Sequence, residues 1–382
     1  MDCGTPLLLM GLLAPPDVGD GVRYGPPDGK GQLGDDWGEV HLTENFAVHY
    51  PATVSLELAE QTGELLEQSW RVLVEDEGWR PPPLSESFLV RVELHPQLEY
   101  SGYTAMTSGP EGDFPLIQIR STYSSSPDFY ASLVAHEFAH AVQFAYRANY
   151  RASDDEPWYW EASAEWSAER AMPERDAYAQ QVVYYADRPE LRYSSMQGGH
   201  PYGMSVVNAA LEEHMDTTMR SVWEHGADTP QRTWDEVLRD ATGLAPAGVW
   251  GTFTGAFGNN RLRESHLYAD AIDEPLEMGV SSQLEYLGSH YYRATTSETV
   301  TAVGDVVLSG PDGFGDTITL AEGEVLAVTG LDPKVAVYVL QGDVKRQPKG
   351  CGHTPLAALW LSPVLLLRLR AGRRRRSGCS SR

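Results

Sequence analysis

The chain has 382 residues, 42% of them hydrophobic, which is enough for two or three domains with cores of their own. Its 29 basic and 54 acidic side chains give a formal charge of −25, and this acidic balance argues against nucleic-acid binding and suits a soluble monomer. The cysteines Cys3, Cys351 and Cys379 lie in the terminal tails, which excludes a disulfide framework, a cysteine-ligated metal and a thiol nucleophile from the body of the chain.

Residues 1–37 are predicted to be a signal remnant followed by a linker. The apolar run 7–14 lacks the basic residues that normally precede the core of a secretory signal, so it is a poor or truncated signal peptide. Residues 17–37 are rich in Gly, Asp and Pro, a composition typical of linkers. Their acids could bind Ca²⁺ weakly, although nothing else in the sequence supports a structural calcium ion there.

Residues 38–285 show the patterns of a mixed domain. Apolar runs and alternation predict strands at 40–50, 87–94 and 116–120. Helical periodicity predicts helices at 53–78, 128–146, 157–171, 202–216, 232–241 and 249–257. This segment is expected to be the larger domain of an α+β protein.

Residues 286–345 change in character. Short β-type runs, separated by Gly, Asp and Pro turns, lie at 291–294, 299–303, 317–320, 325–328 and 335–340. Their spacing predicts a small β-sandwich domain of about 60 residues.

Residues 346–382 are predicted to form a sorting tail. Cys351 precedes an apolar run, 354–367, that predicts a short hydrophobic helix, and an arginine block follows at 373–376. The run is shorter than the roughly 20 residues of a spanning helix, but snorkelling arginines can extend it, and the block gives a positive-inside flank. This order resembles the MYXO-CTERM type of sorting tag on exported bacterial proteins. The resemblance implies export, to the cell surface, the outer membrane or the extracellular space, with the tail contacting membrane or sorting machinery.

The segment A-H-E-F-A-H, residues 135–140, carries the chemistry. On a helix, His136 and His140 project from one face a turn apart, which suits two positions around one Zn²⁺. Glu137 lies beside them and can accept a proton from a water that zinc has made more acidic. The flanking residues are apolar and predict a buried helix, where these polar groups need a partner, and a metal is the simplest common one.

The third ligand is predicted on the next helix. A metzincin would need Gly and a third His where Gln143 and Tyr146 stand, so that class is excluded. The segment W-Y-W-E-A-S-A-E-W-S-A-E, residues 158–169, offers Glu161 and, one turn further on the same face, Glu165. Either carboxylate could be the ligand. With Glu161 on the metal, Glu165 could accept a hydrogen bond from a histidine N–H and so fix its tautomer.

These two segments resemble the gluzincin metallopeptidases, which carry His-Glu-x-x-His on one helix and a Glu ligand on the next. The likeness is closest to bacterial extracellular metallopeptidases with an HEFFHAVQ-like helix, here H-E-F-A-H-A-V-Q, and a W-x-x-E-x-x-A-x-W-x-E-like helix. It implies that residues 38–285 form a zinc metallopeptidase domain with a small sheet and an edge strand, a metal-binding helix and a helical C-terminal half. It implies His136, His140 and Glu161 as zinc ligands, Glu137 as general base, and Glu165 where thermolysin-like enzymes place a supporting acid.

Two further features would complete a peptidase site. His200 and Tyr202, after a Gly-Gly turn, are candidate donors to the oxyanion, with Tyr193 as an alternative, and ordinary packing is the competing interpretation for each. The strand at 116–120 precedes the metal helix directly. By analogy with gluzincins, it would be the edge strand to which an extended peptide substrate adds.

The sequence therefore predicts a secreted or surface-displayed zinc peptidase with one catalytic Zn²⁺ and a peptide or protein substrate. One alternative is a surface binding module on a catalytically degenerate peptidase scaffold, which would have no need of Glu137. Another is a zinc aminopeptidase or a hydrolase of non-peptide substrates. An aminopeptidase usually needs further acids to hold the substrate amine, and no G-x-M-E-N-like segment supplies them.

Overall fold

The computed structural model describes residues 38–109, 111–146, 157–227, 232–268 and 281–343. The predicted signal remnant and linker at 1–37, and the predicted hydrophobic helix and sorting tail at 346–382, lie outside the described residues. Within the described ranges, no helix is long and apolar enough to cross a membrane. The fold is a mixed α+β fold with three sheets among these residues, as the sequence patterns predict.

The N-terminal sheet has five strands in the order β1-β2-β3-β5-β4. β2, β3 and β5 run parallel, whereas β1 and β4 run antiparallel to their neighbours. The strands are β1 (Glu39–Leu42), β2 (Phe46–Tyr50), β3 (Val90–His95), β4 (Gly102–Gly109) and β5 (Gly112–Arg120). The single strand predicted over 40–50 is therefore two strands that pair as a hairpin.

The sheet order corrects one expectation. The run at 116–120, predicted as the edge strand, belongs to β5, which pairs with β3 on one side and β4 on the other. The edge strand is β4, which the sequence patterns did not predict because its Gly, Thr and Ser residues show no apolar alternation. β4 and β5 form an antiparallel hairpin in which Gly109 pairs with Gly112, and β4 is its outer strand.

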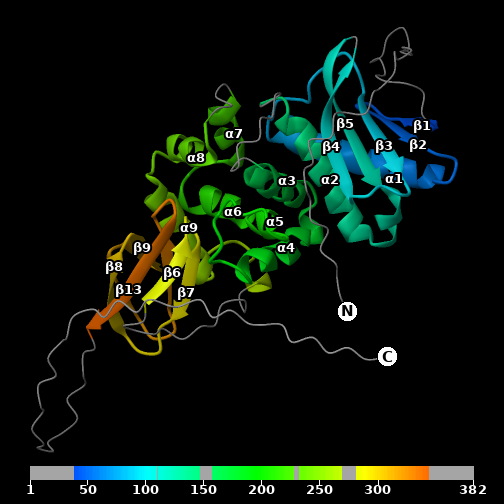
Figure 1. Cartoon of the computed structure of the whole chain (residues 1–382). Helices are drawn as coiled ribbons and strands as arrows, with labels where there is room; N and C mark the ends of the chain where they lie inside the picture. The colour runs from blue at the N-terminus through cyan, green and yellow to red at the C-terminus, as the bar shows by residue number, and fades with distance from the viewer. Residues whose placement is uncertain (1–37, 110, 147–156, 228–231, 269–280, 344–382) are drawn as a thin grey trace, which may run out of the picture. The chain divides into compact units, whose positions relative to one another are not determined.

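Helices α1 (Leu56–Trp70) and α2 (Pro127–Gln143) pack on each other and on this sheet (Figure 1). α1 continues into a π-helical turn, η1 (Arg71–Asp76), and the short 3-10 helix η2 (Ser121–Ser125) leads from β5 into α2. Phe138 of α2 meets Phe46 of β2 edge to face, with ring centroids 5.4 Å apart. This packing holds the helix that carries the two histidines against the sheet.

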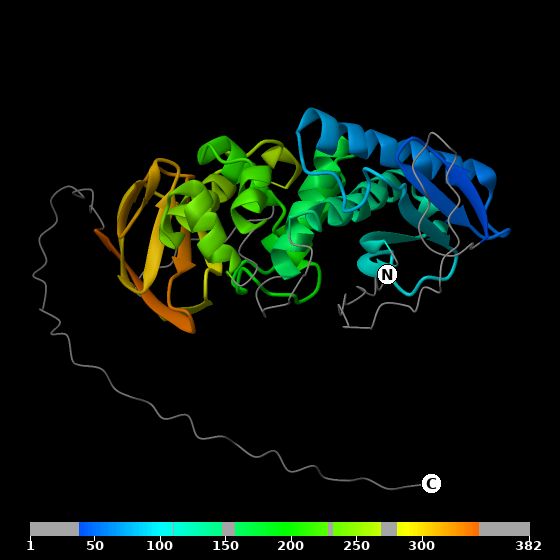
Figure 2. The same cartoon turned by 90° about the horizontal axis from the view of Figure 1, so that it is seen from above.

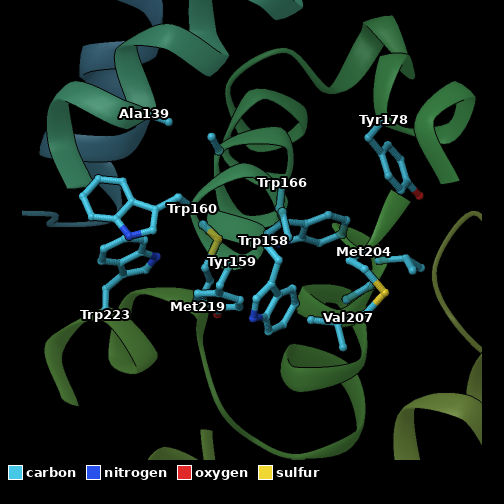
Figure 3. Close-up of a cluster of buried hydrophobic side chains, with 14 of the residues drawn as sticks. Ala139, Trp158, Tyr159, Trp160, Trp166, Tyr178, Met204, Val207, Met219 and Trp223 are labelled. Atoms are coloured by element: carbon cyan, nitrogen blue, oxygen red, sulfur yellow. The ribbon is translucent and has the colours of Figure 1, made fainter. Parts of the chain in front are cut away.

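Helix α3 (Pro157–Ala171) lies beside α2 at the centre of an aromatic core (Figure 3). Trp158, Trp160 and Trp166 are all buried, which confirms the interpretation of these residues as core packing. Trp160 meets Trp223 perpendicularly at a centroid distance of 5.0 Å. Aromatic pairs of this kind stabilise a core beyond their buried area. They hold α3 in place, so that its acidic residues have fixed positions next to α2.

The helical half continues after α3. Its elements are η3 (Pro173–Arg175), α4 (Ala177–Ala186), α5 (His200–Gly203), α6 (Val206–His214), α7 (Met219–Ala227), α8 (Trp234–Thr242), α9 (Pro246–Gly258) and η4 (Ser265–Leu267). The helix predicted at 202–216 is split into α5 and α6. α4 was not predicted, because its Val and Tyr residues have a low intrinsic helix preference, which the surrounding packing overrides.

The C-terminal described residues form two four-stranded antiparallel sheets, β10-β9-β12-β7 and β11-β8-β13-β6, with a shared apolar core. The strands are β6 (Ser281–Glu285), β7 (Ser289–Arg293), β8 (Glu298–Gly304), β9 (Val306–Gly310), β10 (Gly313–Gly315), β11 (Thr317–Leu320), β12 (Val325–Gly330) and β13 (Val335–Asp343). Helix α9 lies against β9 and β12 (Figures 1 and 2). The approach is close: a Cβ added at Gly255 would lie 2.9 Å from the Gly310 carbonyl oxygen.

Candidate metal centre

Three predicted ligands from two helices meet beside the sheet. His136 and His140 come from successive turns of α2 and Glu161 from α3, and their ligand atoms all lie within 4.8 Å of one another. The Nε2 atoms of His136 and His140 are 3.2 Å and 3.6 Å from the same oxygen, Oε2 of Glu161. All three side chains are buried. Two imidazoles and one carboxylate in this arrangement could hold a divalent ion, and the donor set suits zinc.

The electrostatics of this group fit a cation. Glu161 is 1% exposed, and among the described residues its Oε1 has no hydrogen-bond partner. Burial raises the pKa of Glu161, but His140 and His136 outweigh this effect and lower it well below its ordinary value. Burial lowers the pKa of His136, but hydrogen bonds and charges from Glu161 and Glu165 outweigh it and raise this pKa to about 10. The two carboxylates therefore favour positive charge at this point.

Glu165 lies behind His136 and does not face both histidines. The Nδ1 of His136 is 3.1 Å from Oε2 of Glu165. If Nδ1 donates this hydrogen bond, the lone pair of Nε2 is free and faces Glu161. Both Nε2 atoms face Glu161, so the geometry favours Glu161 over Glu165 as the third ligand and leaves Glu165 to orient His136.

Gln143 performs the same task for His140, a role that the sequence analysis missed. Its Oε1 lies 2.8 Å from Nδ1 of His140, and its Nε2 donates to the Trp160 carbonyl and to Oγ of Ser163, each at 3.0 Å. The side chain therefore links α2 to α3 and orients an imidazole at once. The spacing could have revealed it, because a residue three positions after His140 lies on the same helix face.

The edge strand β4 holds Glu137. Thr104 Oγ1 lies 2.7 Å from Oε2 of Glu137, to which it can donate a hydrogen bond, and 3.0 Å from the Glu137 carbonyl oxygen. A Cβ added at Gly102 would lie only 2.3 Å from Oε1 of Glu137. Burial raises the pKa of Glu137, an effect that the charges of His140 and His136 partly offset. Neither Thr104 nor Gly102 was predicted, because β4 itself was not.

Of the three candidate oxyanion donors, the structure brings only Tyr202 to this group. Its ring centroid lies 5.8 Å from that of His136, and burial raises its pKa well above the ordinary value, as do the charge of Glu161 and a hydrogen bond to it. His200 instead packs against Tyr185, and burial lowers its pKa to about 4. Side chains two positions apart on a helix point in directions that differ by about 200°, so His200 and Tyr202 cannot both face the site.

Tyr193, the remaining candidate donor, lies in the aromatic core. Its ring packs against Trp158 and Trp250, at centroid distances of 5.2 Å and 5.3 Å. This placement agrees with the competing interpretation of Tyr193 as a packing residue.

A cavity of about 370 Å³ opens onto the candidate ligands and Glu137. Its walls are residues 101–104 at the start of β4, one face of α2 over residues 128–140, residues 180–184 of α4 and the turn at 198–199. Its aromatic lining residues are Tyr103, Tyr123, Phe129, Tyr184 and Tyr202. The volume is typical of small-ligand sites, and an aromatic wall beside polar groups suits a substrate with apolar side chains.

Comparison with known proteins identifies no family. No protein-family model matches the chain, and no curated protein is a significant match to it. The resemblance to gluzincins stays a prediction, supported by the two motifs and by the geometry of the residues in them.

Proposed function

We propose that the chain is a gluzincin-type zinc peptidase that hydrolyses peptide bonds. One observation carries the proposal: the Nε2 atoms of His136 and His140, each oriented through its Nδ1, face one oxygen of Glu161 at the base of a cavity that Glu137 also lines. A metal site alone needs no acid at position 137. The presence of Glu137, positioned by the hydrogen bond from Thr104, favours an enzyme over a degenerate binding scaffold.

Each side chain around the cavity then has a defined task. Zinc, when bound, supplies a Lewis acid that polarises the scissile carbonyl and makes water more acidic. Glu137 accepts the proton of the attacking water and later donates it to the leaving amine, a task that its raised pKa favours. Tyr202 stays protonated at neutral pH and can donate to the oxyanion that develops on the carbonyl.

The edge strand gives a place for an extended substrate. The outer edge of β4 has no strand partner among the described residues, and residues 101–104 line the cavity. A peptide chain can add to such an edge through main-chain hydrogen bonds, with its side chains placed alternately toward and away from the cavity. The substrate would therefore pair with β4 and not with β5, the strand predicted from the sequence.

Export and display are part of the proposal and rest on the sequence. Residues 346–382 resemble a sorting tag, and the acidic body suits a soluble secreted monomer. The order of the described elements, a sheet with an edge strand, then the metal helix, then a helical half, supports the gluzincin-type arrangement.

The direct test is Glu137→Gln, with Glu57→Gln on the exposed side of α1 as a matched control. Zinc content, measured by elemental mass spectrometry, should be equal in both variants and the wild type. Hydrolysis of a library of N-acetylated peptides should fall by about 100-fold or more in Glu137→Gln only. Undiminished cleavage would remove Glu137 as the base. Wild-type protein without zinc would favour the binding module. Cleavage of a second library with free N-termini, together with no cleavage of the N-acetylated library, would favour an aminopeptidase.

A further inference from the structure

Helix α3 carries a third buried acid that the zinc group does not use. Glu161, Glu165 and Glu169 follow one another at intervals of four residues, which places Glu169 about 12 Å along the helix from Glu161 at 1.5 Å per residue. Glu169 is only 7% exposed. Among the described residues, none donates a hydrogen bond to its carboxylate or forms an ion pair with it. A buried carboxyl group in this state either keeps a proton or needs a positive partner.

Two further carboxylates face Glu169. One oxygen each from Glu169, Asp176 and Glu264 lies within 4.8 Å of the other two. Asp176 is the residue before α4 and Glu264 the residue before η4, so the cluster joins three segments of the helical half. Tyr178 donates a hydrogen bond of 2.8 Å to Oε2 of Glu264 and so helps to orient that carboxylate.

No protein cation neutralises this cluster directly within the described residues. The guanidinium that lowers the pKa of Glu169, that of Arg263, forms ion pairs with Glu213 at 2.9 Å and Glu212 at 3.6 Å. Burial and the charges of Glu264 and Asp176 together raise the pKa of Glu169 to about 8, and the charge of Arg263 offsets only part of this rise. Without a cation, Glu169 is therefore mostly protonated at neutral pH, and a bound cation would have to displace this proton.

We propose that Glu169, Asp176 and Glu264 form a second metal site, which binds calcium. The three donors are all carboxylate oxygens, the hard ligands that Ca²⁺ prefers, with no nitrogen or sulfur to select zinc. At calcium–oxygen distances of about 2.4 Å, two ligands of one ion are at most about 4.8 Å apart, which fits the observed cluster. Asp176 is exposed and leaves room for the water ligands that complete calcium coordination.

A calcium ion bound by these three carboxylates would connect the end of α3 with the start of α4 and with the segment after α9. The end of α3 lies one turn beyond Glu165, so the ion would also steady the helix that presents Glu165 and Glu161. The site would bind a different ion with a different set of ligands from the zinc group. It does not depend on peptidase activity.

The test uses the full-length, zinc-loaded protein in calcium-free buffer, titrated with CaCl₂ by calorimetry and melted with and without the ion. We expect one calcium per chain and a rise in Tm of about 5 °C or more at a calcium concentration 100-fold above Kd. MgCl₂ should give a clearly smaller rise. Glu169→Gln should lose both responses, and without calcium it should melt no lower than wild type, because Gln is a neutral side chain of the same size as the protonated Glu169.

The control is Glu174→Gln, an exposed acid in the same stretch that lies outside the cluster and should keep the full calcium response. Asp176→Asn is a second variant that leaves the core untouched and should lower calcium affinity about 10-fold. A wild type without a calcium response would overturn the proposal, as would a Glu169→Gln protein that responds like wild type or an equal response to magnesium. Glu137→Gln should bind calcium like wild type. A failure of the peptidase proposal can therefore be told apart from a failure of the calcium proposal.

Discussion

Replacing Gly102 by alanine should impair catalysis while leaving folding and zinc binding nearly intact. A Cβ at this position would lie 2.3 Å from Oε1 of Glu137 and 2.6 Å from its Cδ and Cγ. An ordinary contact is about 3.5 Å, so the Glu137 carboxylate has to move by about 1 Å. The backbone of Gly102 lies outside the left-handed region, so the alanine itself is not strained.

The effects on rate and stability differ in size. Misplacing a catalytic group by about 1 Å can lower the rate about 100-fold, which corresponds to about 2.7 kcal/mol of transition-state stabilisation. Folding should lose less, about 1 kcal/mol, because only the hydrogen bond from Thr104 is at risk and the end of the Glu137 side chain can turn away. His136, His140 and Glu161 keep their contacts, so zinc content should not change.

The assay compares kcat/KM on a fluorogenic peptide, zinc content and urea unfolding for Gly102→Ala, Gly109→Ala and wild type. Gly109 is the control: it lies on the same strand, and a Cβ there would meet only the Phe114 ring, at 3.0 Å, and ordinary contacts beyond it. If the kcat/KM of Gly102→Ala equalled that of wild type, catalysis would not depend on the observed position of the Glu137 carboxylate, and the reasoning would be refuted. Loss of zinc in that variant would show that β4 holds the ligands as well as the base.

Three further predictions concern the supporting residues. Glu165→Gln should weaken zinc binding about 10- to 100-fold, measured by competition with a chromogenic chelator, because it weakens the acceptor at Nδ1 of His136; unchanged affinity would show that this contact does not matter. Tyr202→Phe should lower kcat about 100-fold with KM and zinc content retained, and an unaffected kcat would exclude Tyr202 as the oxyanion donor. Burial raises the pKa of Glu93, but hydrogen bonds with His95, Gln118 and Arg91 outweigh it and lower this pKa to about 2. Since the folded-state value lies below the ordinary 4.5, the stabilisation is complete above about pH 5 and is lost as pH falls toward 2. Between pH 6 and pH 3, wild type should therefore lose about 2 kcal/mol more unfolding free energy than Glu93→Gln in urea titrations; equal losses would contradict the assignment.

Much of the candidate site is local and could be predicted from the sequence. His136 and His140 share a helix face through the period of the helix alone, and Pro157 and the apolar pattern after it mark the start of the helix that carries Glu161. Short-range periodicity and the motif resemblance were sufficient for these residues, because their relation depends on helix geometry and on one short connection.

The tertiary structure decided what depends on pairing between distant segments. β4 is a strand because it pairs with β5, so neither its role as the edge nor the contacts of Thr104 and Gly102 with Glu137 could be seen in its own composition. Likewise, only the folded chain brings Glu264 to Glu169, and only the packing of α5 decides that Tyr202, and not His200, lines the cavity. Local patterns record which face of an element is apolar, whereas contacts between elements arise from packing that no local pattern encodes.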